Sequence, residues 1–269
     1  MTAARQDIGT TESARDYVTH VFAVADAEFH KLMHDPLELF SRAIQPVLWL
    51  VLFGEVMAQV HGITSEGQRY VDFLAPGILA QSVLFVSIFY GISAIWERDL
   101  GVLHRYMVSP APRSALVLGK ALSSNVRALS QAVVVYVCAV LLGVSMDVDP
   151  VHILAVVALI ALGSALFSTF SLIIACIVKT RERFMGIGQV LTMPIFFASN
   201  AIYPIAIMPA WLKIIAIVNP LTYEVDGLRA MMLRGSTSGL GLATDFAVLS
   251  AVFAGLLLIA TRFYPRMTE

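Results

Sequence analysis

The chain has 269 residues, of which 58% are hydrophobic and only 14% are charged, and its mean hydropathy is +0.79. Soluble domains are about 45–50% apolar and about 25% charged, so this composition indicates a membrane protein. The net charge of −1 gives no basis for binding nucleic acid. The two cysteines, Cys138 and Cys176, both lie in apolar runs, and their positions indicate neither a disulfide framework nor a Cys/His metal site.

The N-terminal region divides into two predicted parts. Residues 1–14 have no periodicity, and we expect them to be disordered. Residues 15–41 repeat apolar side chains with a helical period, as in Val18, Phe22 and Phe29, but are too polar to cross a bilayer. They predict an amphipathic helix in the membrane interface. A soluble helix packed on a partner is the alternative. The first 20 residues lack the apolar core of a signal peptide, so we expect an internal span to direct insertion.

Residues 42–269 are predicted to form one all-α transmembrane domain. A bilayer core of about 30 Å needs about 20 apolar residues in a helix. Six runs meet this requirement, at about 43–60, 73–96, 128–146, 151–178, 184–203 and 242–264.

The distribution of positive charge predicts the orientation. With six spans, both termini and the loops around 97–127 and 179–183 share one side, which carries fourteen of the eighteen Lys and Arg residues. Because the more positive side of a membrane protein faces the cytoplasm, both termini are expected in the cytoplasm. The protein itself is expected in the cell or inner membrane.

The segment 204–241 is too apolar for a solvated loop and too interrupted for a span. Its prolines predict two short helices, and Asn219-Pro220 is a typical cap with a first-turn proline. Each helix would cross about half of the bilayer, so we predict a re-entrant pair in the outer leaflet. A lid that merely packs on the domain is the alternative. The candidate residues of this pair are Pro204, Trp211, Asn219, Pro220, Tyr223 and Arg229.

The sequence contains no ATP-binding, hydrolase or metalloprotease motif, so we expect neither an enzyme nor a resident cofactor or metal. His30 and His34 are four residues apart, but a polar helix face explains them better than a metal site. The predicted span centres carry no ionisable group, which argues against an ion-coupled carrier.

Neutral polar residues within the spans are the candidates for a substrate path. Hydrogen bonding between helices is the competing explanation for each of them. The candidates are Gln81, Ser82, Gln131, Gln189, Thr192, Ser199 and Asn200.

Residues 96–112 form the longest charged interruption between apolar runs, and they end in two prolines. Such a segment is either a plain loop or a handle that another protein grips.

Several ordered stretches resemble the permease subunit of type-2 ABC exporters, in the branch of daunorubicin-resistance and nodulation-factor exporters. They cover about residues 28–235. The stretches are Gln45-Pro46 with Leu52-Phe53-Gly54, Phe73-Leu74-Ala75-Pro76-Gly77-Ile78, Glu97-Arg98-Asp99-Leu100-Gly101 with Ser109-Pro110, Ser199-Asn200-Ala201-Ile202-Tyr203-Pro204, and Asn219-Pro220-Leu221-Thr222-Tyr223 with Asp226-Gly227-Leu228-Arg229.

The resemblance implies six spans, an interfacial helix and two outer re-entrant helices. It also implies two permeases paired with two cytoplasmic ATPases, which bind the ATP and Mg²⁺. The charged segment would then be a cytoplasmic coupling helix that fits a groove on the ATPase. Its predicted contact residues are Glu97, Arg98, Asp99, Leu100, Gly101, Leu103, Arg105, Pro110 and Arg113.

These observations predict an exporter permease that moves a hydrophobic or amphiphilic substrate, such as a drug, lipid or glycolipid, outward. Two alternatives stay open: a polysaccharide exporter of the same family, with Trp49, Tyr90 and Tyr136 as candidate aromatic contacts, and a membrane anchor or sensor that transports nothing.

Overall fold

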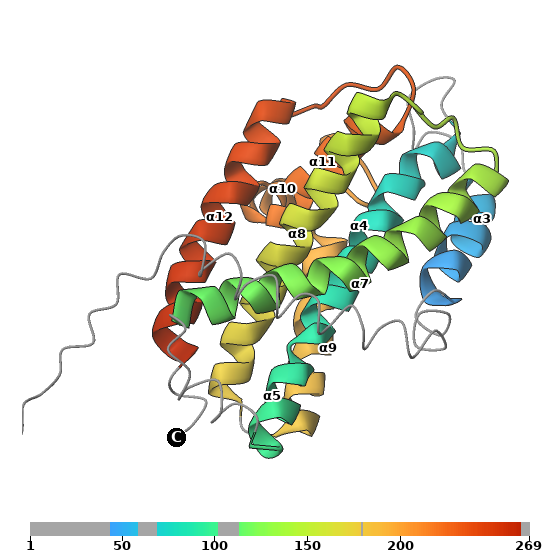
Figure 1. Cartoon of the computed structure of the whole chain (residues 1–269). Helices are drawn as coiled ribbons and strands as arrows, with labels where there is room; N and C mark the ends of the chain where they lie inside the picture. Colours follow the sequence, from blue (N-terminus) through green and yellow to red (C-terminus); the bar gives the residue numbers. More distant parts are fainter. Residues whose placement is uncertain (1–43, 59–68, 102–112, 179, 265–269) are drawn as a thin grey trace, which may run out of the picture.

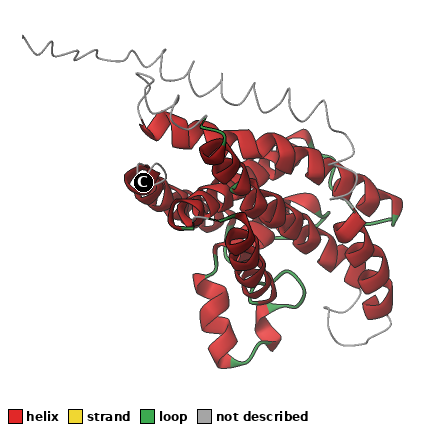
Figure 2. Cartoon of the chain, turned by 90° about the horizontal axis from the view of Figure 1, so that it is seen from below, coloured by secondary structure: helices red, strands yellow, loops and turns green. Residues whose placement is uncertain are grey.

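The computed structural model describes residues 44–58, 69–101, 113–178 and 180–264, and all of its regular elements are helices (Figures 1 and 2). Within these ranges, β pairing is limited to one isolated bridge, between Met146 and Leu233. The predicted disordered segment 1–14 and interfacial helix 15–41 lie outside the described residues.

Within the part of the chain that the structure describes, four stretches of helix are long and apolar enough to cross a membrane. The first comprises α4 (Tyr70–Tyr90) and α5 (Ile92–Asp99), which meet at Gly91. The others are α7 (Arg113–Leu141), α8 (Pro150–Ile177) and α12 (Leu242–Phe263). They correspond to the predicted second, third, fourth and sixth spans, although α7 ends five residues before the predicted limit because Gly143 turns the chain with a φ of +72°.

The two other predicted spans are shorter helices in the structure. The first includes a π-helical segment, η1 (Trp49–Phe53), followed by α3 (Gly54–Ala58). The fifth is α9 (Arg181–Phe197), which ends six residues before the predicted limit. At 17 residues, α9 is shorter than the about 20 needed to cross a bilayer core. Six spans therefore stay a prediction.

Local sequence explains where several helices begin. The Asp149 carboxylate accepts a hydrogen bond from the Val151 N–H at 2.8 Å, and Pro150 occupies the first turn of α8. The Thr180 hydroxyl accepts one from Arg183 N–H at the start of α9. These caps satisfy amides that have no partner within their own helices.

Helix α8 lies at the centre of the bundle and packs against α4, α7, α11 and α12 (Figure 1). Small residues on α8 permit this close packing. The Ser164 hydroxyl lies 3.0 Å from that of Ser87 on α4 and 2.9 Å from that of Ser124 on α7. One polar site therefore ties three helices together within an apolar core.

Two short helices follow α9, at the positions that the prolines and Asn219 predict. After the single turn η2 (Ile205–Ile207), α10 (Ala210–Val218) begins directly after Pro209. Helix α11 (Pro220–Met232) follows with Asn219 as its cap. The two helices differ in burial: Trp211, Ile214 and Val218 on α10 are exposed, whereas nearly all of α11 is buried against α4, α8 and α12.

Candidate functional site

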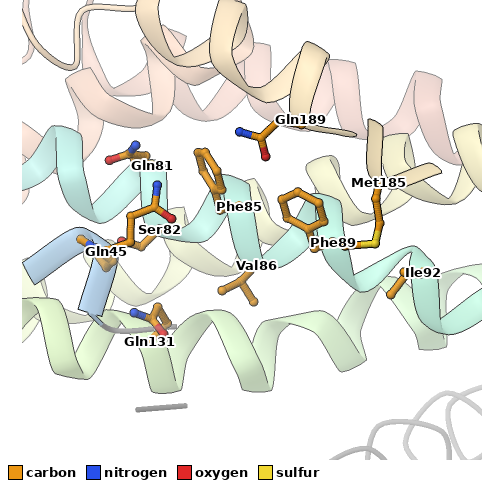
Figure 3. Close-up of a pocket in the computed structure, with 11 residues that line it drawn as sticks. Gln45, Gln81, Ser82, Phe85, Val86, Phe89, Ile92, Gln131, Met185 and Gln189 are labelled. Atoms are coloured by element: carbon orange, nitrogen blue, oxygen red, sulfur yellow. The ribbon is translucent and has the colours of Figure 1, made fainter. Parts of the chain in front are cut away.

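A pocket of about 410 Å³ opens between the first described helix (Ile44–Phe53), α4, α7 and α9 (Figure 3). Helix α4 supplies most of the wall, because Gln81, Phe85 and Phe89 repeat every four residues along one face. The whole lining set is Gln45, Pro46, Gln81, Ser82, Phe85, Val86, Phe89, Ile92, Gln131, Met185 and Gln189.

Four of the seven predicted substrate-path residues meet at this pocket: Gln81, Ser82, Gln131 and Gln189. The Ser82 hydroxyl is satisfied within its own helix by the Ile78 carbonyl, at 2.8 Å. Gln81 differs, since its side chain is only 3% exposed and its Oε1 accepts no hydrogen bond within the described part of the chain. A buried acceptor without a partner is costly, which distinguishes Gln81 from the satisfied Ser82.

The chemical character of the pocket is amphiphilic and uncharged. Aromatic rings and a thioether alternate with carboxamide groups, and none of its described lining residues carries a formal charge. Carboxamides both donate and accept hydrogen bonds. Such a surface suits a ligand with an apolar body and a few neutral polar groups.

The other three predicted path residues lie elsewhere. The Thr192 hydroxyl donates to the Gly188 carbonyl within α9. Ser199 and Asn200 lie in the turn after α9, where the Asn200 carbonyl accepts a hydrogen bond of 2.9 Å from Arg229 of α11. Their contribution to a substrate path stays a prediction.

Residues of the predicted outer helix pair form hydrogen bonds that stabilise the turn after α9. The Asn219 side chain donates to the carbonyls of Ile195 and Ala198, while its oxygen caps the Leu221 amide. The Tyr223 hydroxyl donates to the Ile217 carbonyl. Pro204 directly precedes η2. These contacts fix the exit of α9 against the start of α11.

A second polar cluster lies at the opposite end of the bundle. Lys120 of α7 and Glu97 of α5 form an ion pair of 2.5 Å, with side chains only 7% and 14% exposed. Arg181 at the start of α9 donates two hydrogen bonds to Asp99, and its guanidinium lies 3.4 Å from the ring centroid of Trp96. Side chains from three helices, α5, α7 and α9, therefore meet at one end of the bundle.

The predicted coupling helix is only partly described. Glu97, Arg98 and Asp99 are the last residues of α5 rather than the start of a separate helix. Leu100 follows with 70% of its surface exposed, and Gly101 turns the chain with a φ of +71°. Arg113 begins α7. Leu103, Arg105 and Pro110 lie outside the described residues.

Several site features escaped prediction from the sequence. The pocket residues Phe85, Phe89 and Met185 are not among the predicted substrate-path residues. Their spacing was a usable signal, because Phe85 and Phe89 follow Gln81 at intervals of four residues and Met185 precedes Gln189 by four. Glu224 of α11 is fully buried against Gly163 of α8, and neither of its carboxylate oxygens has a hydrogen-bond partner among the described residues. A polar residue on a short helix gave no sign of such burial.

A bundle of apolar helices, several of them long enough to cross a bilayer, is the architecture of an integral membrane protein. The family model for the ABC-2 type transporter matches residues 19–233. The chain therefore belongs to the ABC-2 type transporter family. It is an all-helical, multi-pass membrane permease.

Named relatives agree with this assignment. The chain is 29% identical over 222 residues to the transport permease ycf38 of Cyanophora paradoxa, covering 82% of this chain and 76% of the relative. It is 24% identical to the daunorubicin resistance ABC transporter permease protein DrrB1 of Streptomyces coeruleorubidus, over 84% of this chain and 77% of the relative. Nodulation protein J of Rhizobium meliloti is also 24% identical, over 76% and 77%.

Proposed function

We propose that this chain is the permease subunit of an ATP-driven exporter that moves a neutral amphiphile, such as a drug, lipid or glycolipid, out of the cytoplasm or inner leaflet. The observation that carries this proposal is the pocket, which combines Phe85 and Phe89 with the buried, unsatisfied Gln81. A membrane anchor or sensor has no need for such a pocket. The family, together with the drug-resistance and nodulation relatives, supports an export role.

The pocket favours a compact amphiphile over a long glycan. A glycan path is expected to present Trp and Tyr rings, yet Trp49, Tyr90 and Tyr136 are absent from the described pocket lining. Trp49 packs on Phe53 and Phe196, and the Tyr136 hydroxyl donates to the Asp147 carbonyl at 3.3 Å. Tyr90 is buried beneath Arg127.

The end of the bundle that carries the Glu97–Lys120 and Asp99–Arg181 pairs is proposed to face the cytoplasm and to bind a separate ABC ATPase. The ends of α5 and α8, the starts of α7 and α9, and the C-terminal end of α12 pack into one cluster there, which contains Ile95, Val117, Val178, Phe184 and Tyr264. The distribution of positive charge predicts that this same end faces the cytoplasm. Exposed Leu100 offers an apolar contact for the ATPase.

The partnership is tested by purifying the full chain in mild detergent from its native membranes and identifying the co-purifying proteins by mass spectrometry. We expect a stoichiometric P-loop ATPase and a second permease, and the copies present will distinguish an identical pair from two related chains. If no ATPase is recovered, even after cross-linking at residues 97–101, the ATP-driven assignment fails and the anchor or sensor function gains support.

The substrate class is tested with that same complex in nanodiscs. A neutral, photoactivatable lipid analogue should label the α4 peptide that contains residues 81–89, and an excess of unlabelled neutral amphiphile should prevent labelling. Equal labelling of Leu258 on the exposed face of α12, with no competition, would show lipid contact rather than a binding site.

A further inference from the structure

Two carboxylates from different helices share one hydroxyl at the outer end of the bundle. Ser238 lies in the loop between α11 and α12, which Figure 1 shows in orange-red. Its Oγ is 2.7 Å from Asp226 Oδ2 on α11 and 2.9 Å from Asp245 Oδ2 on α12. The same Oγ accepts a hydrogen bond of 2.7 Å from the Gly241 N–H.

Counting hydrogens shows that the site needs one more proton. A serine hydroxyl has a single hydrogen to donate and two lone pairs to accept with. Because Ser238 can donate to only one carboxylate, two ionised groups would leave an oxygen–oxygen contact with no hydrogen between the atoms. A proton on one carboxyl removes this conflict, since that carboxyl then donates to the second lone pair of Ser238.

The surroundings decide which carboxyl holds the proton. Asp226 Oδ2 also accepts the Leu240 N–H at 2.9 Å, and Arg229 on the same helix interacts electrostatically with Asp226. Two donors and a nearby cation stabilise a negative charge there. Asp245 has no exposed surface, and its Oδ1 has no hydrogen-bond partner among the described residues. A neutral acid tolerates that environment far better than an anion does.

The other elements around Asp245 present no competing charge. Towards α12 and Gly227, α8 contributes the apolar side chain of Leu159. His152 of α8 is bound to Asp147, and Lys120 of α7 to Glu97. On α4, Asp72 accepts the Ser145 amide. The other ionisable groups on these helices have contacts or positions of their own. Tyr70 donates to Ile202, Tyr136 donates to Asp147, and Arg127 lies over Tyr90. Glu224 faces Gly163, and Arg262 lies in the last turn of α12.

We propose that Asp226, Ser238 and Asp245 form a proton-binding site that holds one proton on Asp245 and thereby fastens α11 to the start of α12. The proton completes the chain Asp245 Oδ2–H to Ser238 Oγ, and Ser238 Oγ–H to Asp226 Oδ2. Its loss leaves two negative charges around one hydroxyl and weakens the connection between the helices. The inference concerns the chain itself and does not depend on transport.

The direct test is infrared spectroscopy of the full-length chain in nanodiscs as a function of pH. We expect the carbonyl band of a protonated carboxylic acid to disappear as the pH rises. Asp245→Asn should remove that titrating band, because the amide supplies the hydrogen without titrating. Glu224→Gln, the control for the other buried acid, should leave it in place. Persistence of the titrating band in Asp245→Asn, or the lack of any such band in the wild type, overturns the proposal.

Thermal unfolding gives an independent second readout. The unfolded chain releases the Asp245 proton above a pH of about 4, and the folded chain releases it only at a higher pH, so between these two points the site makes stability fall as pH rises. Asp245→Asn should lose that part of the decline. Asp226→Asn should keep it but move it to lower pH, because the negative charge that retains the proton is gone. If Ca²⁺ or Mg²⁺ instead raises the melting temperature through Asp245, the site binds a cation, and the shared proton is wrong.

Discussion

The guanidinium of Arg181 binds the carboxylate of Asp99 through two hydrogen bonds, of 3.1 and 2.8 Å, and so joins the end of α5 to the start of α9. About a third of each side chain is exposed, and exposed ion pairs contribute about 0–1 kcal/mol to stability. Asp99→Asn should therefore lower the thermal stability only slightly. A double-mutant cycle with Arg181→Gln, measured by thermal unfolding, checks this expectation. A coupling of several kcal/mol would show that the pair is far better shielded in the assembled protein.

Lys120 and Glu97 should behave differently, because their ion pair is nearly buried. Removing one partner strands the other charge, so Lys120→Met should cost about 3 kcal/mol of stability. The double variant Glu97→Gln/Lys120→Met should recover most of that loss, since no buried charge remains. Thermal unfolding of the two single variants and the double variant tests the expectation. A double variant no more stable than the worse single variant would contradict it.

The Glu97–Lys120 pair also changes how the coupling hypothesis is tested. Glu97→Ala is a poor test of the predicted coupling contact, because the loss of this pair would impair folding as well as any contact with an ATPase. Gly101→Pro has a similar fault, because proline cannot adopt the φ of +71° found there. Leu100 is the cleaner probe, since most of its side chain is exposed.

Leu100→Ser should leave the free energy of unfolding of the isolated chain within about 0.5 kcal/mol of the wild-type value, as surface substitutions usually do. In the complex with its ATPase, the same variant should reduce substrate-stimulated ATP hydrolysis and export. Trp96→Ser is unsuitable as a control because Trp96 stacks on Arg181, whereas Leu258→Ser makes the same substitution at another exposed leucine, on α12. Normal coupling in Leu100→Ser would exclude this residue from the ATPase contact.

Gln81 should show opposite effects on stability and on export. Its buried Oε1 lacks a partner in the described structure, and an unsatisfied buried group costs about 1–3 kcal/mol. Gln81→Leu removes that cost at similar volume, so the variant should melt at the same temperature as the wild type or higher. Export and photolabelling by the neutral lipid analogue should fall. Gln189→Leu is the control, because Gln189 lies at the exposed rim of the same pocket. It also loses an amide group, but that amide is not buried, so the comparison separates the effect of burial from that of losing an amide.

The positions of most helices could be predicted because their signals are local. Long apolar runs, and the caps Asp149-Pro150 and Asn219-Pro220, need only neighbouring residues to act. The end of α9 could not be predicted from such signals. The run 184–203 carries no charge to its end, yet the helix stops at Phe197, where Asn219 binds the carbonyls of Ile195 and Ala198 from 21 and more positions away.

The candidate site was predictable as a set of residue types but not as an arrangement. Treating neutral polar residues within the spans as substrate-path candidates predicted Gln81, Gln131 and Gln189, and the fold brings all three to one pocket. The same rule also selected Ser199, whose hydroxyl donates to Phe196 in a turn. Nothing in the local sequence separates these two outcomes, because the difference depends on which helices become neighbours.

Gly77 tests how tightly α4 packs against the turn that follows α9. A methyl group at this position would overlap the backbone carbonyl of Ala201, which cannot move aside as a flexible side chain could. Gly77→Ala should therefore lower the free energy of unfolding by about 1–3 kcal/mol, the usual cost of overpacking a core. Gly255→Ala is the matched control, because Gly255 lies within α12 and a Cβ there meets no described atom within 4 Å. That variant should be as stable as the wild type or up to about 1 kcal/mol more stable, since alanine favours the helix. Thermal unfolding in the same detergent compares the two variants, and equal melting temperatures would show that α4 does not contact this turn in solution.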